Sequence, residues 1–155
     1  MPHGDLPVRP ACMWDGPALT ALERAGWSWL SEVAPQRTEG AAVFDEQCRA
    51  EGFPVAELAS EAVGYIRQVP ATPPASNQHV RQIRGLQVSN DLRGHGVGKT
   101  LVEAACAAAR VQGARRMSLR VLGHNVPARR LSERCGFRIE GVQPGEFLLG
   151  DSSTP

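Results

Sequence analysis

Apolar and polar residues recur along this chain with two different periods. Between Gly98 and Gln112, apolar or small residues return every three or four positions, a spacing that predicts a helix with one apolar face. The residues of this face are Leu101, Val102, Ala105, Cys106, Ala108 and Ala109. Gly113 follows and is expected to end the helix. A face of such small side chains suits close packing on a sheet.

Three shorter helices are expected elsewhere. Asp15 precedes a helical stretch that ends at Gly26, and Asn125 precedes one that ends at Gly136. Asp and Asn at these positions are typical helix caps, because their side chains accept a hydrogen bond from a free backbone N–H. Residues 44–50 form a less regular third segment.

Runs of β-branched and aromatic residues predict strands. The runs VAEL (55–58) and AVGYIR (62–67) are separated by three residues, which indicates a hairpin. Residues 79–88 form another strand, in which Gly85 breaks the alternation and predicts a bulge or a close backbone approach. The remaining strand-like runs cover residues 116–121, 137–142 and 146–149. Helices and strands therefore alternate in a mixed α/β pattern without an internal repeat.

Length and composition indicate one globular domain. The chain has 155 residues, of which 42% are hydrophobic and 21% charged. No run of about 18 apolar residues occurs, and the first residues lack a basic region followed by an apolar run, so we expect a cytoplasmic protein that does not enter a membrane. The cysteines show no metal-ligand spacing, and we expect reduced, mostly buried thiols and no metal; they are Cys12, Cys48, Cys106 and Cys135.

The net charge of +1 conceals an asymmetry between the two halves. Residues 1–78 carry five Arg and ten acidic residues, whereas residues 79–155 carry eleven Arg and one Lys against six acidic residues. One half is suited to an anionic cofactor and the other to a cationic substrate, although solvated faces would give the same charges. A total charge near zero argues against nucleic acid as a partner.

Residues 94–100 read GHGVGKT and invite comparison with the phosphate loop of nucleotide triphosphatases. That loop requires a glycine five positions before Gly98, and position 93 is an arginine. The strand-like run after the helix also lacks the aspartate that binds magnesium in such enzymes. A nucleotide triphosphatase is therefore not favoured.

A different glycine pattern, Q/R-x-x-G-x-G/A, fits residues 93–98. It lies between a predicted strand and a predicted helix, where free N–H groups and the positive end of the helix dipole favour a pyrophosphate. Glycines there allow a close approach of the backbone to a ligand, although they would equally serve a turn alone.

Together with a second motif, this pattern resembles the GNAT superfamily of acyl-CoA-dependent N-acetyltransferases. The two stretches are LQVSNDLRGHGVGKTLVEAA (86–105) and LRVLGHNVPARRLSERCGF (119–137). The resemblance implies a single α/β (α+β) domain over residues 1–155, with a mixed, mostly antiparallel sheet flanked by helices. Acetyl-CoA would lie in a V-shaped split between the fourth and fifth strands. Residues 79–142 would form the acetyl-CoA-binding core and residues 1–78 the acceptor side.

The resemblance also implies individual contacts to acetyl-CoA. The backbone of the strand would meet the pantetheine, and the glycine pattern would hold the pyrophosphate. The residues concerned are Leu86, Gln87, Val88, Arg93, Gly94, His95, Gly96, Val97, Gly98, Lys99 and Asn125. Alternatives remain for four of them: Arg93 as a solvated arginine, His95 as an exposed loop histidine, Lys99 as an exposed lysine without an anion, and Asn125 as a helix cap only.

The usual catalytic groups of the family are replaced in this chain. Gln82 stands where many members have a glutamate base, and Ser132 stands where many have a tyrosine acid. A serine hydroxyl is a weaker acid than a tyrosine hydroxyl, and Ser132 is the candidate proton donor at this position. The candidate replacement bases, which would act through water, are His79, Glu57 and Glu61.

The sequence therefore predicts an N-acetyltransferase that moves an acetyl group from acetyl-CoA to a primary amine of a small molecule or protein. The acidic half suggests a cationic acceptor. The alternative is a catalytically weak acyl-CoA-binding or regulatory domain. The chain ends soon after residue 149, so a short last strand would leave a sheet edge exposed, and we expect a homodimer that covers it.

Overall fold

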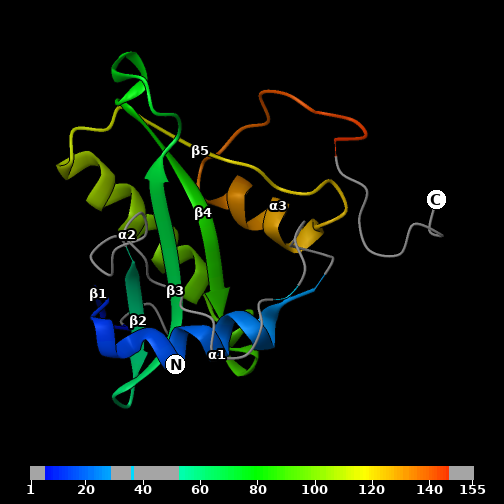
Figure 1. The fold of residues 1–155 in the computed structure, drawn as a ribbon. Coiled ribbons are helices and arrows are strands. Elements are labelled where there is room, and N and C mark those ends of the chain that lie inside the picture. Colours follow the sequence, from blue (N-terminus) through cyan, green and yellow to red (C-terminus); the bar gives the residue numbers. More distant parts are fainter. Residues whose placement is uncertain (1–5, 29–35, 37–52, 147–155) are drawn as a thin grey trace.

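A five-stranded sheet forms the centre of the computed structural model, which describes residues 6–28, 36 and 53–146. The strands lie in chain order, and each is antiparallel to the next except the last pair, which is parallel (Figure 1). Their bounds are β1 (Val8–Pro10), β2 (Pro54–Leu58), β3 (Glu61–Pro70), β4 (Val80–Val88) and β5 (Arg116–Leu119). The predicted mixed, mostly antiparallel sheet is confirmed.

Helices cover both faces of this sheet. The described α-helices are α1 (Gly16–Gly26), α2 (Val97–Val111) and α3 (Val126–Arg134), and short 3₁₀ turns occur at Met13–Asp15, Ala75–Asn77 and Asn90–Leu92. In Figure 1, α1 crosses in front of the sheet and α2 lies behind it. The termination glycine after α2, Gly113, has the expected positive φ of 90°.

Two apolar clusters hold the layers together. On the α1 face, the buried residues are Ala11, Leu19, Phe53, Val55 and Tyr65. On the α2 face, they are Leu6, Ala56, Ile66, Val97, Leu101, Val102 and Ala105. The apolar face that the sequence predicts on α2 accordingly packs on the sheet.

The hairpin and the bulge are both found where the sequence predicts them. The turn between β2 and β3 consists of Ala59 and Ser60, with φ of 51° and 66°. These left-handed values suit a tight hairpin turn, although Asn and Gly adopt them more readily. The register of β3 on β4 shifts between Arg67 and Gln68, which face Gly85 and Ile83. Arg84 is thus the extra residue of a bulge beside Gly85.

Three predictions of local structure need correction. Asp15 precedes α1, but its side chain makes no cap; it accepts hydrogen bonds from the Arg9 guanidinium and the Cys12 backbone N–H. The strand predicted over 116–121 ends at Leu119. Residues 137–142 form no strand and are not paired with any strand of the described sheet.

Other predictions fall partly outside the described residues. The helix expected over 44–50, Cys48 and residues 147–149 of the last predicted strand all lie there. The described cysteines, Cys12, Cys106 and Cys135, are free and half-buried. Among the described helices, none has the length and apolar character needed to cross a membrane.

The split between β4 and β5 is confirmed and has a defined starting point. Val80 to Ile83 pair with Arg116 to Leu119, and the two strands part after that. Arg84–Val88 therefore has β3 on one edge and no β5 partner on the other. We call the point where the strands part, beyond Ile83 and Leu119, the mouth of the split.

Candidate functional site

A glycine-rich loop joins the end of β4 to the start of α2. Gly94 and Gly96 have φ of 83° and 84°, a conformation that glycine adopts without strain. A Cβ added to either would meet no atom within 4 Å, so both face open space. Gly96 is the N-cap of α2 and supplies no side-chain cap. The exposed N–H groups of the first turn of α2 are thus left for an anion, which fits the pyrophosphate of acetyl-CoA.

Gly98 and its neighbours in the first turn of α2 divide into three environments. Val97 is buried under the sheet, and Lys99 is exposed. A Cβ on Gly98 would lie 3.1 Å from Leu131 Cδ2 of α3. Gly98 therefore lets α3 approach α2, a structural role that the glycine pattern alone did not indicate.

The backbone of Leu86, Gln87 and Val88 lies on the free edge of β4. The side chains of Leu86 and Val88 pack towards α2, whereas Gln87 is buried beside Gly26 at the end of α1. Backbone groups on the edge away from β3 have no β5 strand to pair with in the described sheet. This edge leads directly into the glycine loop, as a ligand that runs from pantetheine to pyrophosphate requires.

Arg93 is exposed overall, but its guanidinium reaches back to α1. A Cβ on Gly26 would overlap the amide oxygen of Gln87 and lie 3.3 Å from Arg93 Nη2. The C-terminal end of a helix carries partial negative charge, which favours a cation there. The Arg93 guanidinium therefore lies beside the C-terminal end of α1. The backbone N–H of His95 donates to Leu92 at 3.3 Å within the same loop.

Asn125 caps α3 as predicted. Its Oδ1 accepts a hydrogen bond from the Ala128 N–H at 3.3 Å, and the residue is 9% exposed. The hydroxyl of Ser132 donates to the Ala128 carbonyl at 2.8 Å. Its proton is therefore engaged within its own helix, an arrangement that does not favour a role as proton donor.

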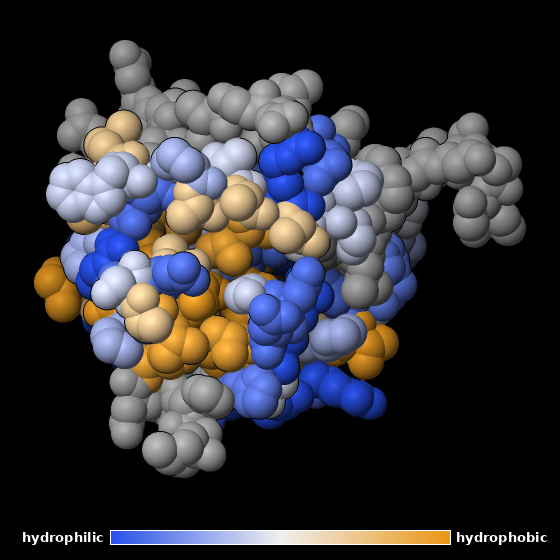
Figure 2. Space-filling view, turned by 90° about the horizontal axis from the view of Figure 1, so that it is seen from below, coloured by the Kyte–Doolittle hydropathy of each residue, from blue (hydrophilic) through white to orange (hydrophobic). Residues whose placement is uncertain are grey.

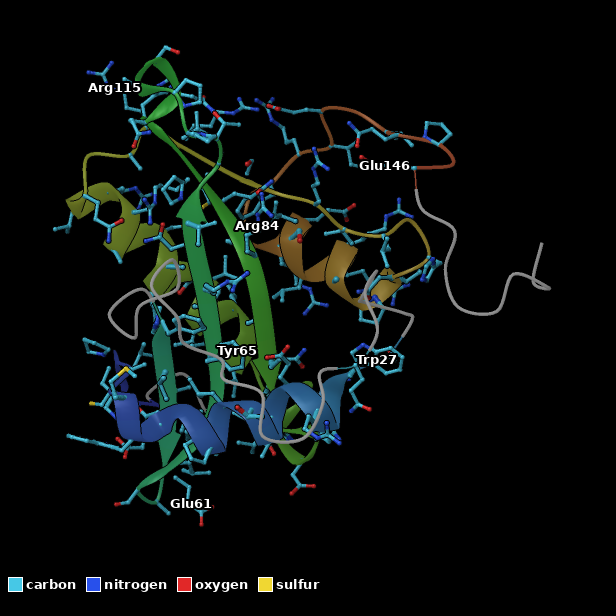
Figure 3. The ribbon with its side chains drawn as sticks, viewed as in Figure 1. Trp27, Glu61, Tyr65, Arg84, Arg115 and Glu146 are labelled. Carbon is cyan, nitrogen blue, oxygen red and sulfur yellow. The ribbon has the colours of Figure 1, made fainter. Side chains whose placement is uncertain are left out.

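The candidate bases lie at opposite ends of the sheet. His79 is exposed and precedes β4, whereas Glu57 pairs with Ala62, beyond the register position of Val88. At about 3.3 Å per strand residue, more than about 30 Å separates them along the sheet. Figure 3 shows Glu61 at the lower end, well away from Arg84. No single acceptor position reaches both His79 and the two glutamates.

Glu57 is also part of a charged network that sequence reasoning missed. Arg9 donates to both carboxylate oxygens of Asp15, at 2.8 and 2.9 Å, and to Glu57 at 3.2 Å. The hydrogen bonds from Arg9 lower the pKa of Asp15 below its ordinary value, and those to Asp15 and Glu57 raise the pKa of Arg9. Strand pairing brings these groups together, since β1 lies beside β2.

A cavity of roughly 740 Å³ opens at the same end of the molecule, between α1, the β2–β3 hairpin and the end of β4. Figure 2 looks at this end and shows apolar side chains gathered between hydrophilic ones. The charged residues of its lining are Arg9, Asp15, Glu57, Glu61 and Asp91. Most of the acidic groups described in the amino-terminal half thus gather here.

The mouth of the split has a different character. Arg84 follows the last paired residue of β4, and its Nε donates to the Gln82 amide oxygen at 2.6 Å. Arg120 follows the last paired residue of β5 and forms an ion pair with Glu146 at 3.4 Å. Among the described residues, no cluster of His, Cys, Asp and Glu is placed to hold a metal ion.

Comparison with known proteins connects these features to one family. N-acetyltransferase 8F1 of Rattus norvegicus is 36% identical over 91 residues, which are 57% of this chain and 41% of that protein. N-acetyltransferase 8B of Homo sapiens is 29% identical over 127 residues, which are 81% of this chain and 56% of that protein. The chain thus spans about half the length of these curated relatives.

The fold has a solved counterpart in yncA of Salmonella typhimurium, a structure with its cofactor acetyl-CoA. It superposes with a TM-score of 0.71 at 20% identity and covers 92% of this chain and 88% of that one. The model of the acetyltransferase (GNAT) family matches residues 17–137. Because that match spans most of the chain, this protein belongs to the acetyltransferase (GNAT) family.

Proposed function

We propose that this protein is an N-acetyltransferase that transfers the acetyl group of acetyl-CoA to a primary amine. One observation carries the proposal: the free edge of β4 runs from the mouth of the split into the uncapped N-terminus of α2. Such a continuous row of backbone donors and acceptors suits a ligand with an amide-containing arm and a pyrophosphate. The bound thioester would supply an activated acetyl carbon at the mouth.

In the proposed reaction, the amine nitrogen forms a bond to the acetyl carbon, and the carbon–sulfur bond breaks. The amine loses a proton, and the departing sulfur gains one. Gln82 at the mouth is not a base, and His79 lies about 10 Å from it along the strand direction by strand rise. We infer that water accepts the proton and that rate enhancement comes mainly from positioning the amine against the thioester.

Calorimetric titration with acetyl-CoA tests the cofactor part of the proposal. Gly96→Glu places a negative side chain at the proposed pyrophosphate position and is expected to abolish binding. Gly113→Glu is a matched control, because Gly113 has a similar φ of 90° and open surroundings but follows the far end of α2. Equal loss in both variants, or retained binding in Gly96→Glu, contradicts the assigned site.

The second candidate is an acyl-CoA-binding domain with little catalytic activity. Gln82 and the internally bonded Ser132 favour it, because neither offers the usual acid–base chemistry. Release of free thiol from acetyl-CoA across a panel of amines separates the two candidates. Tight binding without acceptor-dependent thiol release supports the binding domain.

A further inference from the structure

We propose that the acceptor carries an anionic group, such as a carboxylate, beside its amine, and that Arg84 binds this group. The inference rests on the proposed acetyltransferase function and names its class of acceptor. It follows from the charge at the mouth of the split. Each arm of the split begins with an arginine, Arg84 on β4 and Arg120 directly after the end of β5.

The side chain of Arg84 lies on the sheet face away from α2. Ile83 and Leu86 pack into the cluster beneath α2, so the exposed Arg84 and its partner Gln82 lie on the other face. Figure 3 shows Arg84 near the middle of β4, on the side of the split. The guanidinium is thus placed where β4 loses its β5 neighbour.

Among the described residues, the Arg84 side chain uses one of its hydrogen-bond donors. Its Nε donates to Gln82, and no ion pair joins it to any residue that the structure describes. The two terminal nitrogens present a fork of donors that matches a carboxylate. The hydrogen bond from Nε to Gln82 fixes the direction of that fork before a ligand arrives.

The neutral side chain at position 82 preserves the charge of Arg84. An amide oxygen orients the guanidinium without neutralising it, whereas a carboxylate at the same place would form an ion pair with it. By contrast, Arg116 on β5 and Arg120 directly after it have partners in Glu140 and Glu146. Arg84 is therefore the source of uncompensated positive charge among these described residues of the mouth.

Three described carboxylates that line the cavity do not cancel this charge. Asp15, Glu57 and Glu61 line the cavity near the end of β4, and Glu57 lies about six strand residues from Arg84. That separation is about 20 Å, which exceeds the screening length of about 8 Å at physiological ionic strength. These three carboxylates therefore do not favour a cationic acceptor at the mouth.

Matched pairs of α-amino acids and their α-amides test the inference. The probes are L-phenylalanine, L-methionine and L-glutamate, each with its α-amide, together with phenethylamine and spermidine. Acceptor-dependent thiol release from acetyl-CoA gives kcat/KM for each. The α-amine of the amide is less basic than that of the acid, so a larger fraction of it is neutral and reactive at the same pH. A preference for the acid therefore does not arise from the protonation state of the amine. We expect at least one acid to be preferred over its amide by about tenfold or more.

Variants then assign that preference to Arg84. Arg84→Gln is expected to lower kcat/KM for the preferred acid by roughly 10- to 100-fold and to change that of its amide little. Gln82→Glu is expected to reduce the same preference, because the new carboxylate pairs with Arg84. Arg110→Gln, on the exposed side of α2, is the control and should retain the preference. Acetyl-CoA affinity should be unchanged in all three.

Two outcomes overturn the inference and differ in what they say of the proposed function. In the first outcome, the enzyme uses the amides, phenethylamine or spermidine as well as it uses the acids, and Arg84→Gln affects all of them alike. The protein is then an acetyltransferase that does not recognise an anionic group. Acetyl-CoA binding without thiol release to any probe rejects both the anionic acceptor and, for these amines, the proposed transferase activity.

Discussion

Single residues in this protein hold together segments that are far apart in the chain. Arg9 on β1 joins Asp15, just before α1, to Glu57 on β2 through three hydrogen bonds. The side chain of Asp15 is only 7% exposed, so its charge depends on Arg9 for compensation. Gly26 has a comparable role at the other end of α1, because its lack of a side chain admits Gln87.

The Arg9–Asp15 ion pair is expected to make the free energy of unfolding depend on pH. The pKa of Asp15 is held below its ordinary 3.8, mainly by the hydrogen bonds from Arg9, so the folded protein binds this proton less readily than the unfolded chain. The stabilisation that ionised Asp15 gives the folded state is fully present at pH values above the ordinary pKa of 3.8. It is lost as the pH falls through the lower pKa that Asp15 has in the folded protein. Asp15→Asn should cost about 2 kcal/mol near neutral pH.

Urea unfolding between pH 7 and pH 2 provides the measurement. The free energy of unfolding should fall with acidification more steeply in the wild type than in Asp15→Asn, so that the difference narrows below about pH 4. Asp91→Asn removes an exposed carboxylate and should stay within about 0.5 kcal/mol of the wild type. A constant gap between wild type and Asp15→Asn at every pH would show that the pair does not have this role.

Gly26→Ala should disturb the cofactor loop from a distance. The new Cβ overlaps the amide oxygen of Gln87, which is buried and has little room to move, and it crowds Arg93 Nη2. We expect a several-fold weaker acetyl-CoA affinity, measured by calorimetry, because both neighbours adjoin the proposed binding edge. Gly123→Ala is the control, since a Cβ there meets nothing within 4 Å. Equal affinities in the two variants would separate Gly26 from the cofactor site.

At the scale of helices and strands, the sequence patterns predicted those features that depend on residues close together in the chain. The apolar face of α2 and the cap at Asn125 depend on residues within a few positions of one another, and both are found. Asp15 was wrongly expected to cap α1, because its stronger partner, Arg9, lies in another element. Residues 137–142 have a strand-like pattern, but a strand also needs a neighbour, which the pattern does not reveal.

In the candidate site, too, the locally determined features were predicted and those that depend on the tertiary structure were not. The glycines at 94 and 96 were identified from spacing, since their open, left-handed conformation is a local property. The distance between His79 and Glu57 depends on strand register, so sequence alone grouped residues that the sheet separates. The importance of Arg84 depends on where β5 leaves β4, which is a tertiary feature.

Asn125 allows capping and ligand contact to be separated. Asn125→Ala removes the acceptor for the Ala128 N–H and should destabilise the protein by about 1 kcal/mol. Asn125→Asp keeps an acceptor at the helix start and should recover that stability. If Asn125 also contacts acetyl-CoA, Asp should leave the affinity weakened, whereas a cap alone predicts wild-type affinity in Asn125→Asp. Thermal unfolding and calorimetry on the same samples supply both readings.

At the scale of the whole molecule, described acidic and basic groups lie at different positions along the sheet. Acidic groups surround the cavity at the end of β4, and a cation stands at the mouth about 20 Å away by strand rise. A bound cofactor along the free edge of β4 would extend from the mouth towards the glycine loop. Substrate selection at the mouth and phosphate binding at α2 would then be independent, so variants at one end should leave the other unchanged.

The remaining prediction concerns assembly. In the described sheet β5 is the outermost strand beyond β4, and the segment after α3 carries two large apolar side chains on the surface, Ile139 at 66% and Val142 at 78% exposure. An open strand edge beside exposed apolar residues favours pairing with a second copy. We expect a homodimer in sedimentation velocity at micromolar concentration. Ile139→Lys combined with Val142→Lys should shift it to monomer without lowering the melting temperature of the domain, and a monomeric wild type would contradict this arrangement.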